Sequence, residues 1–520
     1  MTKHRGILKN TVIVAAFTSL SRVLGLVREM LQSRLVGAGM EQSAFTLAFA
    51  VPNMARKLFG EGALTAAFVP IFKGEVEREG IEKAARLARA VMTSVLVCLV
   101  AATVLATGAV EGVSRWLAAH AADGSDGRIE LASSLVETLL PYMVFICAAA
   151  FGTGVVNALG RFKASSFMPA LLNVCWIAAL ATLFFVPSLS SAERVKWIAR
   201  AILAAGAVQM VFMFRVMARC GVSPAPLFSG WRSPGVVNVW RKIGIGALGA
   251  GAVQINYMLD QILAQVANPW AAGVIGYAER LMDLPLGVIG VAFGTVLLPA
   301  FSGFFARGDV DGARDVLASS LERLMFAMIP AAAGLFVLAP EMTSVIYEGR
   351  AFDAVATERV SRALAVYALG LCFFAFQKTL VPWFQAQGDL KTPLKVSTGA
   401  VAVNACLNVA AVVFLPVEMR HIGLAASTTA CAALSSLALY VFARRKNGHT
   451  GLSRTVGPIS VYFAAALAMA AAVYMAKPAC ALAADCIGIP AVTGAAALAG
   501  LVFLGMAVYF LLAKAGRNLI

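Results

Sequence analysis

Apolar stretches of about 20 residues recur from one end of this 520-residue chain to the other, and they constrain its fold more than any other feature. Each is long enough to cross a hydrocarbon core of roughly 30 Å. Because backbone N–H and C=O groups find no water there, a spanning segment must be a helix or part of a closed barrel. A barrel requires alternating segments of about ten residues, and these are absent. The sequence therefore predicts an all-helical membrane protein.

The chain holds fourteen such stretches, and their connections alternate in charge. Lysine and arginine are frequent in 73–89 and 215–242 but absent from 37–42 and 268–270. Cytoplasmic connections carry an excess of positive residues, so an even number of spans places both termini in the cytoplasm. The same pattern explains the net charge of +16 without a nucleic-acid partner, because no connection is long enough to form a basic domain. The predicted spans are 11–36, 43–72, 84–108, 132–158, 166–187, 195–218, 243–267, 271–301, 318–346, 358–388, 392–416, 420–443, 457–477 and 489–513.

Two segments of the chain are repeated at nearly the same distance. Residues 64–80 resemble 293–309, and residues 157–166 resemble 385–394, with offsets of 229 and 228. Parallel repeats of this kind occur in secondary transporters, where the substrate site lies between the halves near the midplane. We therefore predict two six-helix lobes around a central cavity, followed by two further helices. The predicted parts are an N-lobe at 1–218, a cytoplasmic linker at 219–242, a C-lobe at 243–446 and a C-terminal helix pair at 447–520.

At least four arginines lie inside predicted spans, among them Arg22, Arg28, Arg56 and Arg280. A charged side chain at the membrane centre costs roughly 2.5–3.5 kcal/mol, so several together require a hydrated cavity or a ligand of opposite charge. A planar guanidinium donates two parallel hydrogen bonds to phosphate oxygens and stays charged at any depth. The pattern therefore predicts a transporter whose cargo carries a diphosphate or a similar anion. An internal pair of Arg280 with Asp283, three residues along the same helix, is the structural alternative.

The second predicted span contains the segment VPNMARKLFGEGA, in which proline and glycine interrupt the helix. Broken helices at membrane depth are tolerated where the backbone lines a cavity. Asn53 shares a helix face with Arg56 or Lys57, so we place these three residues in the cargo site. Glu61 follows them closely along the chain, and in a purely structural interpretation it pairs with Arg56 or Lys57.

Oxygen-bearing side chains further along the chain suggest a cation site. Asp260 lies in one predicted span, and Asn404 and Asn408 lie one turn apart in another. Carboxylate and amide oxygens are ligands for a small cation such as Na⁺. The alternative is a set of hydrogen bonds between packed helices, without an ion. Coupling to Na⁺, to protons or to the membrane potential stays open at this point.

Residue groupings typical of enzymes are missing from the sequence. The four histidines are scattered among termini and connections, and there is no nucleotide-binding P-loop and no folded extramembrane domain. We therefore expect a transporter and not an enzyme, with no cofactor and no firm metal site. Cys480 and Cys486 share a late connection predicted to lie outside, where a disulfide can form.

Four segments give the chain a family resemblance: SRVLGLVRE, VPNMARKLFGEGALTAAFVP, AERLMDLPLGVIGVAFGTVLLP and GDLKTP. In this order they resemble the MurJ-type lipid II flippases of the multidrug/oligosaccharidyl-lipid/polysaccharide (MOP) exporter superfamily. The resemblance extends through nearly the whole chain. It implies fourteen spans, the last two of which extend a lipophilic groove for an undecaprenyl tail. It also implies alternating access that carries a disaccharide-pentapeptide headgroup to the outer leaflet for peptidoglycan synthesis.

The resemblance also implies site residues. The family's cavity arginines and its second-span acid correspond to Arg22, Arg28, Arg56, Arg280 and Glu61. Two positions depart from the family pattern: Ser43 stands where an acid is common, and Lys57 stands where the family has a second arginine. A sodium site in the second lobe belongs to the family, and the candidates here match it in part, since a second carboxylate would be expected near Asn408.

The residues and the resemblance together predict a flippase for lipid II in the bacterial cytoplasmic membrane. We expect a monomer among membrane lipids, with the buried arginines on the cargo diphosphate and the cell-wall synthesis machinery as a possible contact. One alternative is an exporter of another prenyl-diphosphate-linked polysaccharide repeat. A MATE-like drug/cation antiporter would favour an acid-lined cavity, and a membrane glycosyltransferase would require an acidic catalytic pair on a long loop.

Overall fold

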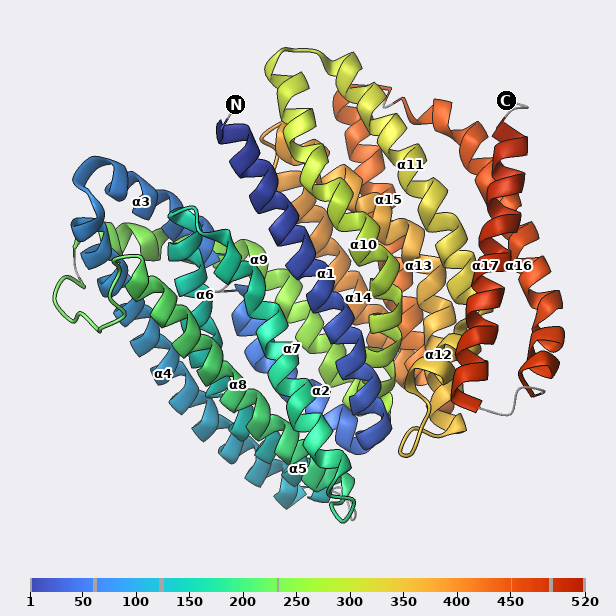
Figure 1. Cartoon of the computed structure of the whole chain (residues 1–520), viewed down its shortest axis with the longest axis horizontal. Helices are drawn as coiled ribbons and strands as arrows, with labels where there is room; N and C mark the ends of the chain where they lie inside the picture. The colour runs from blue at the N-terminus through green and yellow to red at the C-terminus, as the bar shows by residue number, and fades with distance from the viewer. Residues whose placement is uncertain are drawn as a thin grey trace. The chain divides into compact units, whose positions relative to one another are not determined.

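Helices account for the regular structure of the chain (Figure 1). The structure, a computed structural model, describes residues 2–58, 63–120, 126–231, 233–449, 451–485 and 490–517. Within these ranges the chain forms α-helices and short helical turns and no β-strand. Ten of the described helices are long and apolar enough to cross a membrane, which confirms an all-α membrane protein. The count of fourteen spans stays a prediction.

Two compact units divide the chain, and the first comprises residues 1–262 together with 349–352. The interior of this unit is formed by aliphatic and aromatic side chains from most of its helices. Its helices are α1 (Thr2–Val36), α2 (Met40–Ala55), α3 (Ala63–Glu79), α4 (Ile81–His120), α5 (Asp126–Leu139), α6 (Tyr142–Ala158), α7 (Phe162–Phe184), α8 (Ser191–Arg219) and most of α9 (Pro234–Ala267).

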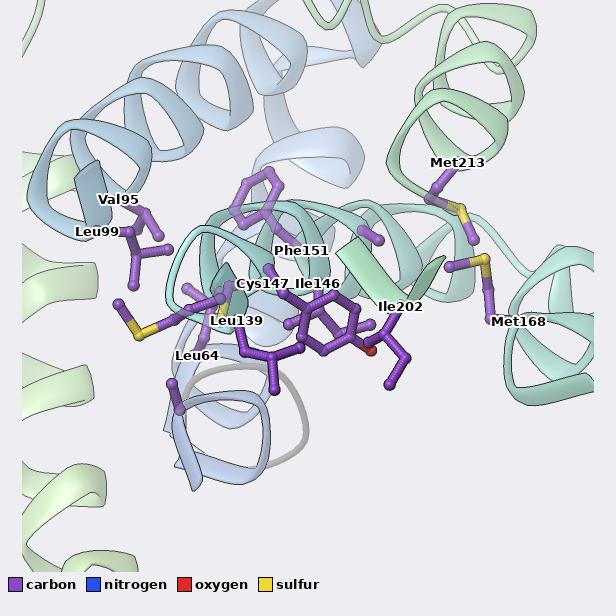
Figure 2. Close-up of a cluster of buried hydrophobic side chains, with 14 of the residues drawn as sticks. Leu64, Val95, Leu99, Leu139, Ile146, Cys147, Phe151, Met168, Ile202 and Met213 are labelled. Carbon is purple, nitrogen blue, oxygen red and sulfur yellow. The ribbon is translucent and has the colours of Figure 1, made fainter. Parts of the chain in front are cut away.

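Helix α6 is buried along most of its length and packs closely on α8. Glycines allow the close approach, because a Cβ at Gly152 would lie 2.5 Å from Met213 Cγ and one at Gly206 would lie 2.5 Å from Tyr142 Cδ2. Small residues at helix contacts serve this purpose in membrane proteins, where lipid tails are as apolar as leucine. Figure 2 shows side chains of α3, α4, α5, α7 and α8 gathering around those of α6.

The first turns of α9 pack into the first unit. Val236, Val239 and Ile243 are buried in its interior, and the Trp240 indole donates to Ser94 Oγ at 3.0 Å. A Cβ at Gly235 would lie 2.9 Å from Leu87 Cδ1. Part of the segment predicted as a linker therefore begins a helix anchored on α4, while the predicted lobe boundaries themselves stay a prediction.

The second unit comprises residues 263–348 and 353–520. Its last two helices pack on each other and on α11, where Tyr462 donates to Glu322 Oε1 at 3.0 Å and Tyr509 donates to the Phe326 carbonyl at 2.7 Å. They form the additional helix pair predicted after the repeat. The helices of this unit are α10 (Ala271–Ala306), α11 (Val310–Val337), α12 (Ala339–Tyr347), α13 (Ala354–Ala386), α14 (Lys391–Phe414), α15 (Arg420–Asn447), α16 (Val456–Asp485) and α17 (Pro490–Arg517), with short turns η2 (Val417–Met419) and η3 (Leu452–Thr455).

The span predicted at 43–72 contains α2 and α3, and two further predicted spans are each divided into two helices. The span predicted at 132–158 consists of α5 and α6, and the span predicted at 318–346 consists of α11 and α12. Proline lies at both junctions: Pro141 precedes α6, and Pro340 occupies the first turn of α12. Proline has no N–H to donate, so it removes one hydrogen bond from the preceding ladder, and its fixed φ suits the first turn of a new helix.

The backbone repeats where the sequence repeats. Gly160 and Gly388, which the offset of 228 pairs, have φ values of 76° and 71°; Gly80 and Gly308, one residue out of register at the offset of 229, have φ values of 82° and 73°. Each residue follows the end of a helix, where a left-handed glycine lets the next N–H groups bond back to the last turn. Arg161 N–H donates to the Val156 carbonyl in this way, and Asp389 N–H donates to the Phe384 carbonyl. The helix ends of the two copies therefore have matching conformations.

A salt bridge joins the start of α14 to the end of α15 and gives a pH prediction. Lys446 Nζ lies 2.8 Å from Asp389 Oδ2, and Thr392 N–H donates to Asp389 Oδ1 at 3.0 Å. The hydrogen bond from Lys446, with help from Thr392, lowers the pKa of Asp389 to about 2. Because the folded pKa is depressed, the carboxylate stabilises the fold above its unfolded pKa of about 3.9. This contribution is lost as the pH falls towards 2.

We expect Asp389→Asn to lower the thermal midpoint of the purified protein at pH 7. The expected loss of unfolding free energy is modest, about 1 kcal/mol, because Lys446 is half exposed and water screens the ion pair. Thermal unfolding in detergent at pH 7 and at pH 2.5 measures it, and the difference between variant and wild type should shrink at the lower pH. An equal difference at both pH values would contradict the role given to this ion pair.

Candidate functional site

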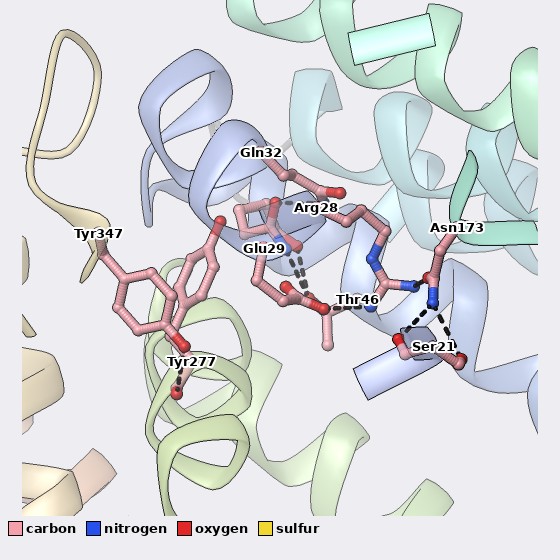
Figure 3. A network of polar contacts seen from close by, with 9 residues as sticks. Ser21, Arg28, Glu29, Gln32, Thr46, Asn173, Tyr277 and Tyr347 are labelled. Atoms are coloured by element: carbon pink, nitrogen blue, oxygen red, sulfur yellow. Dashed lines mark hydrogen bonds and ion pairs between the residues drawn. The ribbon is translucent and has the colours of Figure 1, made fainter. Parts of the chain in front are cut away.

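Arg28 of α1 is enclosed by side chains of its own unit. Helix α1 runs alongside α7 (Figure 1). Arg28 Nη1 donates to Asn173 Oδ1 at 3.0 Å, the guanidinium lies over the Trp176 ring with its carbon 4.3 Å from the centroid, and Nη2 pairs with Glu29. Both charged side chains are only 14% exposed. Arg28 is therefore neutralised and oriented from three sides, and Figure 3 shows two of its partners, Glu29 and Asn173.

Asn173 extends this network along α1. Its Nδ2 donates to the Ser21 carbonyl at 2.9 Å, and a Cβ at Gly25 would lie 3.8 Å from the same nitrogen. Ser21, Gly25 and Arg28 are spaced so that they share the side of α1 that faces α7. Sequence reasoning missed Asn173 and Trp176. Their three-residue spacing within a predicted span was the available signal, since it places an amide and an aromatic ring on one helix face.

Arg22 lies in a different environment. It lines an open pocket of about 300 Å³ bounded by α1, α6 and α7. Within the described residues, its guanidinium makes no hydrogen bond and no ion pair. The other polar residues of the lining are uncharged, and they are Thr18, Ser21, Thr153, Asn157, Ser165 and Ser166. An arginine with positive charge and free donors thus faces a neutral, hydroxyl-rich space.

The segment after α2 departs from regular helix geometry. Helix α2 continues through Pro52 to Ala55, and the chain then widens into a π-helical turn over 56–58. Such turns occur often at functional sites. Arg56 Nε donates to Asn53 Oδ1 at 3.1 Å, and Lys57 Nζ lies 5.0 Å from the centre of the Tyr257 ring. The structure thus brings Asn53 and Arg56 together as predicted.

Two predicted residues bear on the same segment. Glu61 lies outside the described residues, so its pairing with Arg56 or Lys57 stays a prediction. Ser43 is completely buried in α2. A carboxylate at such a position would be cut off from water at a high cost, which fits the neutral hydroxyl found in this chain.

The charges of Arg28 and Arg56 both affect one residue of α6, Tyr142. Arg28 and Arg56 both interact electrostatically with the hydroxyl group of Tyr142, which is buried. They reach it from α1 and from the turn after α2. Three arginines of the first unit thus lie near α6: Arg28 is paired with Glu29, Arg56 follows α2, and Arg22 lines the pocket that α6 and α7 complete.

Arg280 lies on α10 in the second unit. Its side chain is exposed, and so is the side chain of Asp283 one turn further along the helix. Pro285 follows within the same continuous helix. Tyr367 of α13 donates to Glu279 Oε1 at 3.3 Å. Three of the predicted arginines thus belong to the first unit and one belongs to the second.

The candidate cation ligands are divided between the units in the same way. Asn404 and Asn408 are buried in the second unit, and Asn408 Nδ2 donates to Asn404 Oδ1 at 2.9 Å. Asp260 belongs to the first unit, where Asn256 Nδ2 donates to its Oδ2 at 3.1 Å. No cluster of three His, Cys, Asp or Glu side chains suited to a metal occurs in the part of the chain that the structure describes. Cys486 lies outside that part, so its disulfide with Cys480 stays a prediction.

Comparison with known sequences gives a consistent result. The sequence profile of the family described as “Lipid II flippase MurJ” matches residues 32–506. A Vibrio cholerae protein named probable lipid II flippase MurJ is 35% identical over 480 residues, covering 91% of this chain and 89% of that protein. A Burkholderia cenocepacia protein named lipid II flippase MurJ is 34% identical over 441 residues, or 83% of each chain.

Solved structures resemble the fold. A lipid II flippase MurJ in an inward closed conformation gives a TM-score of 0.78 at 20% identity, covering 98% of this chain and 99% of that chain. An inward-facing multidrug resistance MATE family transporter of the MOP superfamily gives 0.68 at 15% identity, covering 86% of this chain and 99% of that chain. At these identities the likeness concerns the fold alone.

Proposed function

The chain belongs to the MurJ family of lipid II flippases, and we propose that it moves lipid II from the inner to the outer leaflet of the cytoplasmic membrane. The family consists of transporters and not of enzymes, and its members are multi-pass proteins of the bacterial inner membrane. The observation that carries the proposal is the unpaired Arg22, which belongs to the same unit as Arg28 and Arg56. Positive charge at this depth requires an anion, and the diphosphate of lipid II supplies one.

In this proposal the arginines bind the cargo diphosphate in turn. Arg22 has free donors, so it makes the first contact. Arg28 then exchanges Glu29 for a phosphate oxygen, while Trp176 continues to hold the guanidinium plane. Arg56 on its widened turn and Arg280 on α10 complete the clamp, with Asn53, Lys57 and Glu61 as neighbouring groups of the site.

Alternating access completes the proposed cycle. When the diphosphate neutralises the arginines, the cost of keeping their charges away from water is removed. We propose that this favours closure of the inward-facing state, after which the protein opens outwards. It acts as a monomer, with both termini in the cytoplasm and with the cell-wall synthesis machinery as a contact. The apolar outer surface of α16 and α17, with Met475 and Phe503 strongly exposed, supports a groove for the undecaprenyl tail.

A sodium ion is the proposed coupling ion, with protons or the membrane potential as the alternatives. The donor set fits in part: Asp260, Asn404 and Asn408 offer hard oxygen ligands, but an amide stands at Asn408 where a second carboxylate would be expected. A bound ion would add positive charge and favour one conformation over the other. We expect translocation in vesicles to slow at least fivefold when choline replaces Na⁺, a factor of the size typical of site coupling. Asn408→Ala should remove this dependence, and equal rates in both salts would exclude sodium coupling.

A MATE-like antiporter is the second candidate, favoured by the structural likeness to a MATE transporter. The charge of the site argues against it. Cationic drugs are held by acidic groups, whereas the described site residues of the first unit are mostly arginines and neutral polar groups. An exporter of another prenyl-diphosphate-linked polysaccharide repeat shares the anionic carrier, so only the headgroup separates it from the first proposal.

Reconstituted translocation tests the proposal directly. Purified protein in vesicles should move fluorescent lipid II between leaflets, and Arg280→Ala should slow this at least tenfold because a charged hydrogen bond to phosphate is lost. Arg362→Ala is the matched control, since Arg362 pairs with Glu358 on the exposed surface of α13. Unchanged translocation by Arg280→Ala would remove this residue from the clamp. A wild-type protein that moves another prenyl-diphosphate cargo but not lipid II would exclude the proposed substrate.

A further inference from the structure

We propose that the pocket beside Arg22 is a binding site for the sugar phosphate part of the cargo. The pocket is bounded by α1, α6 and α7 of the first unit and measures about 300 Å³. Arg22 would hold the phosphate, and the hydroxyl-rich wall would hold the sugar ring attached to it. The inference rests on the proposed function and deepens it, because it assigns one part of the cargo to the first unit alone.

The charge of the pocket matches a single anionic group. Arg22 is the charged residue of the lining and has no partner among the described residues. Arg28 is already neutralised by Glu29, and Arg56 Nε already donates to Asn53. The remaining lining residues are neutral, so the pocket carries one positive charge and no carboxylate to compete with a ligand.

Three of the five hydroxyl groups of the wall present acceptors to the pocket, because their hydrogens are already donated within the protein. A serine or threonine hydroxyl has one hydrogen to donate and two lone pairs to accept. Thr18 donates its hydrogen to the Val14 carbonyl at 2.8 Å, and Ser166 donates to the Phe162 carbonyl at 2.8 Å. Ser165 donates to Asn157 Oδ1 at 2.6 Å. A sugar or an acetamido sugar, which brings several O–H or N–H donors, matches these three acceptors better than inorganic phosphate does.

The size of the pocket agrees with one sugar unit and not with a whole headgroup. Sites for small molecules enclose about 300–1,000 Å³, and this pocket lies at the lower limit of that range. A disaccharide-pentapeptide is too large for it. The pocket therefore suits the sugar adjoining the phosphate, while the rest of the headgroup lies outside it.

The second copy of the repeat lacks the same polar wall. At the offset of 228 residues, three hydroxyl-bearing positions become apolar: Thr153 corresponds to Val381, Ser165 to Pro393 and Ser166 to Leu394. The matching glycine turns show that the copies keep the same backbone at this place. The corresponding helix end of the second copy forms without these hydroxyl groups, which supports ligand binding as a role for them in the first copy.

Direct binding of a small probe tests the inference. The probe is N-acetylglucosamine 1-phosphate, compared with inorganic phosphate and with free N-acetylglucosamine, on the full chain in nanodiscs by saturation-transfer NMR. We expect the sugar phosphate to bind at least fivefold more tightly than either part. Arg22→Gln should weaken it tenfold or more, because a charged hydrogen bond is lost. Thr153→Val with Ser166→Ala should weaken it about threefold to tenfold without changing phosphate binding.

The variants are chosen so that the fold is preserved. Thr153→Val keeps the side-chain shape and copies the residue of the second repeat. Thr182→Ala is the matched control, because Thr182 also donates to a helix carbonyl, that of Ala179 at 2.7 Å, but lies at the other end of α7. This control should bind all three probes like the wild type.

Two results would overturn the inference: inorganic phosphate binding as tightly as the sugar phosphate, or the double variant binding like the wild type. Lipid II translocation is measured on the same preparations and keeps the two proposals apart. Normal translocation without a preference for the sugar phosphate defeats only the pocket assignment. A preference for the sugar phosphate in a protein that does not move lipid II defeats only the proposed cargo.

Discussion

Arg28→Ala is expected to reduce lipid II translocation about a hundredfold and to destabilise the protein at the same time. Translocation slows because the variant loses the guanidinium group, which donates two parallel hydrogen bonds to phosphate oxygens. The loss of stability follows from the surroundings of the residue, because the variant leaves Glu29 only 14% exposed and without its cation. Removing one partner of a buried pair costs about 3–5 kcal/mol, and we expect a value near the lower limit because some water reaches this pair.

A second substitution separates the two effects. In Arg28→Ala with Glu29→Gln, the uncompensated charge is gone, so the thermal midpoint should recover while translocation stays low. Thermal unfolding and vesicle translocation are measured on both variants, with Arg115→Ala as a control from an exposed ion pair on α4. If the double variant translocates like the wild type, Arg28 is a structural residue and takes no part in holding the cargo.

Much of the fold could be predicted from the sequence because each helix carries its own signal. A long apolar stretch identifies a spanning helix by itself, and a repeat at a constant offset identifies a duplicated unit. The glycine positions at 160 and 388 illustrate this, since sequence matching paired them and the backbone gives both a positive φ. Helix junctions were less accessible: Pro340 divides a predicted span, although proline elsewhere in the chain, as at Pro52, lies within a continuous helix.

The candidate site could be predicted only as far as single helices determine it. The sequence identified Arg28 as a charge at membrane depth, but its partner Asn173 lies 145 residues away. Such a contact depends on how α1 and α7 pack, which no pattern within either helix specifies. The pairing with Glu29 was also missed, because adjacent residues on a helix point in different directions and are expected not to meet. Their long side chains overcome that separation.

Gly37→Ala is expected to release the loop at 349–352 from the end of α1. Gly37 has a φ of 80°, a conformation that costs other residues about 1–2 kcal/mol. A Cβ there would lie 2.2 Å from the Ala351 carbonyl oxygen, which is a backbone atom and cannot rotate away. The hydrogen bond from Ala351 N–H to the Arg34 carbonyl, 3.3 Å long, would have to break. The loop packs with the first unit although it connects α12 and α13, so its release affects the region around both helices.

Hydrogen exchange at the Ala351 amide, together with the thermal midpoint, measures this release. Gly39→Ala is the matched control two residues away, because Gly39 has an ordinary φ of −82° and its Cβ would meet only the flexible end of Glu41, at 3.2 Å. Gly37→Asn distinguishes the two causes, since asparagine tolerates a positive φ but still carries a Cβ. If the clash with Ala351 dominates, Gly37→Asn should speed amide exchange as much as Gly37→Ala does. If exchange in Gly37→Ala matches that of the control, the loop is held by contacts other than this close approach.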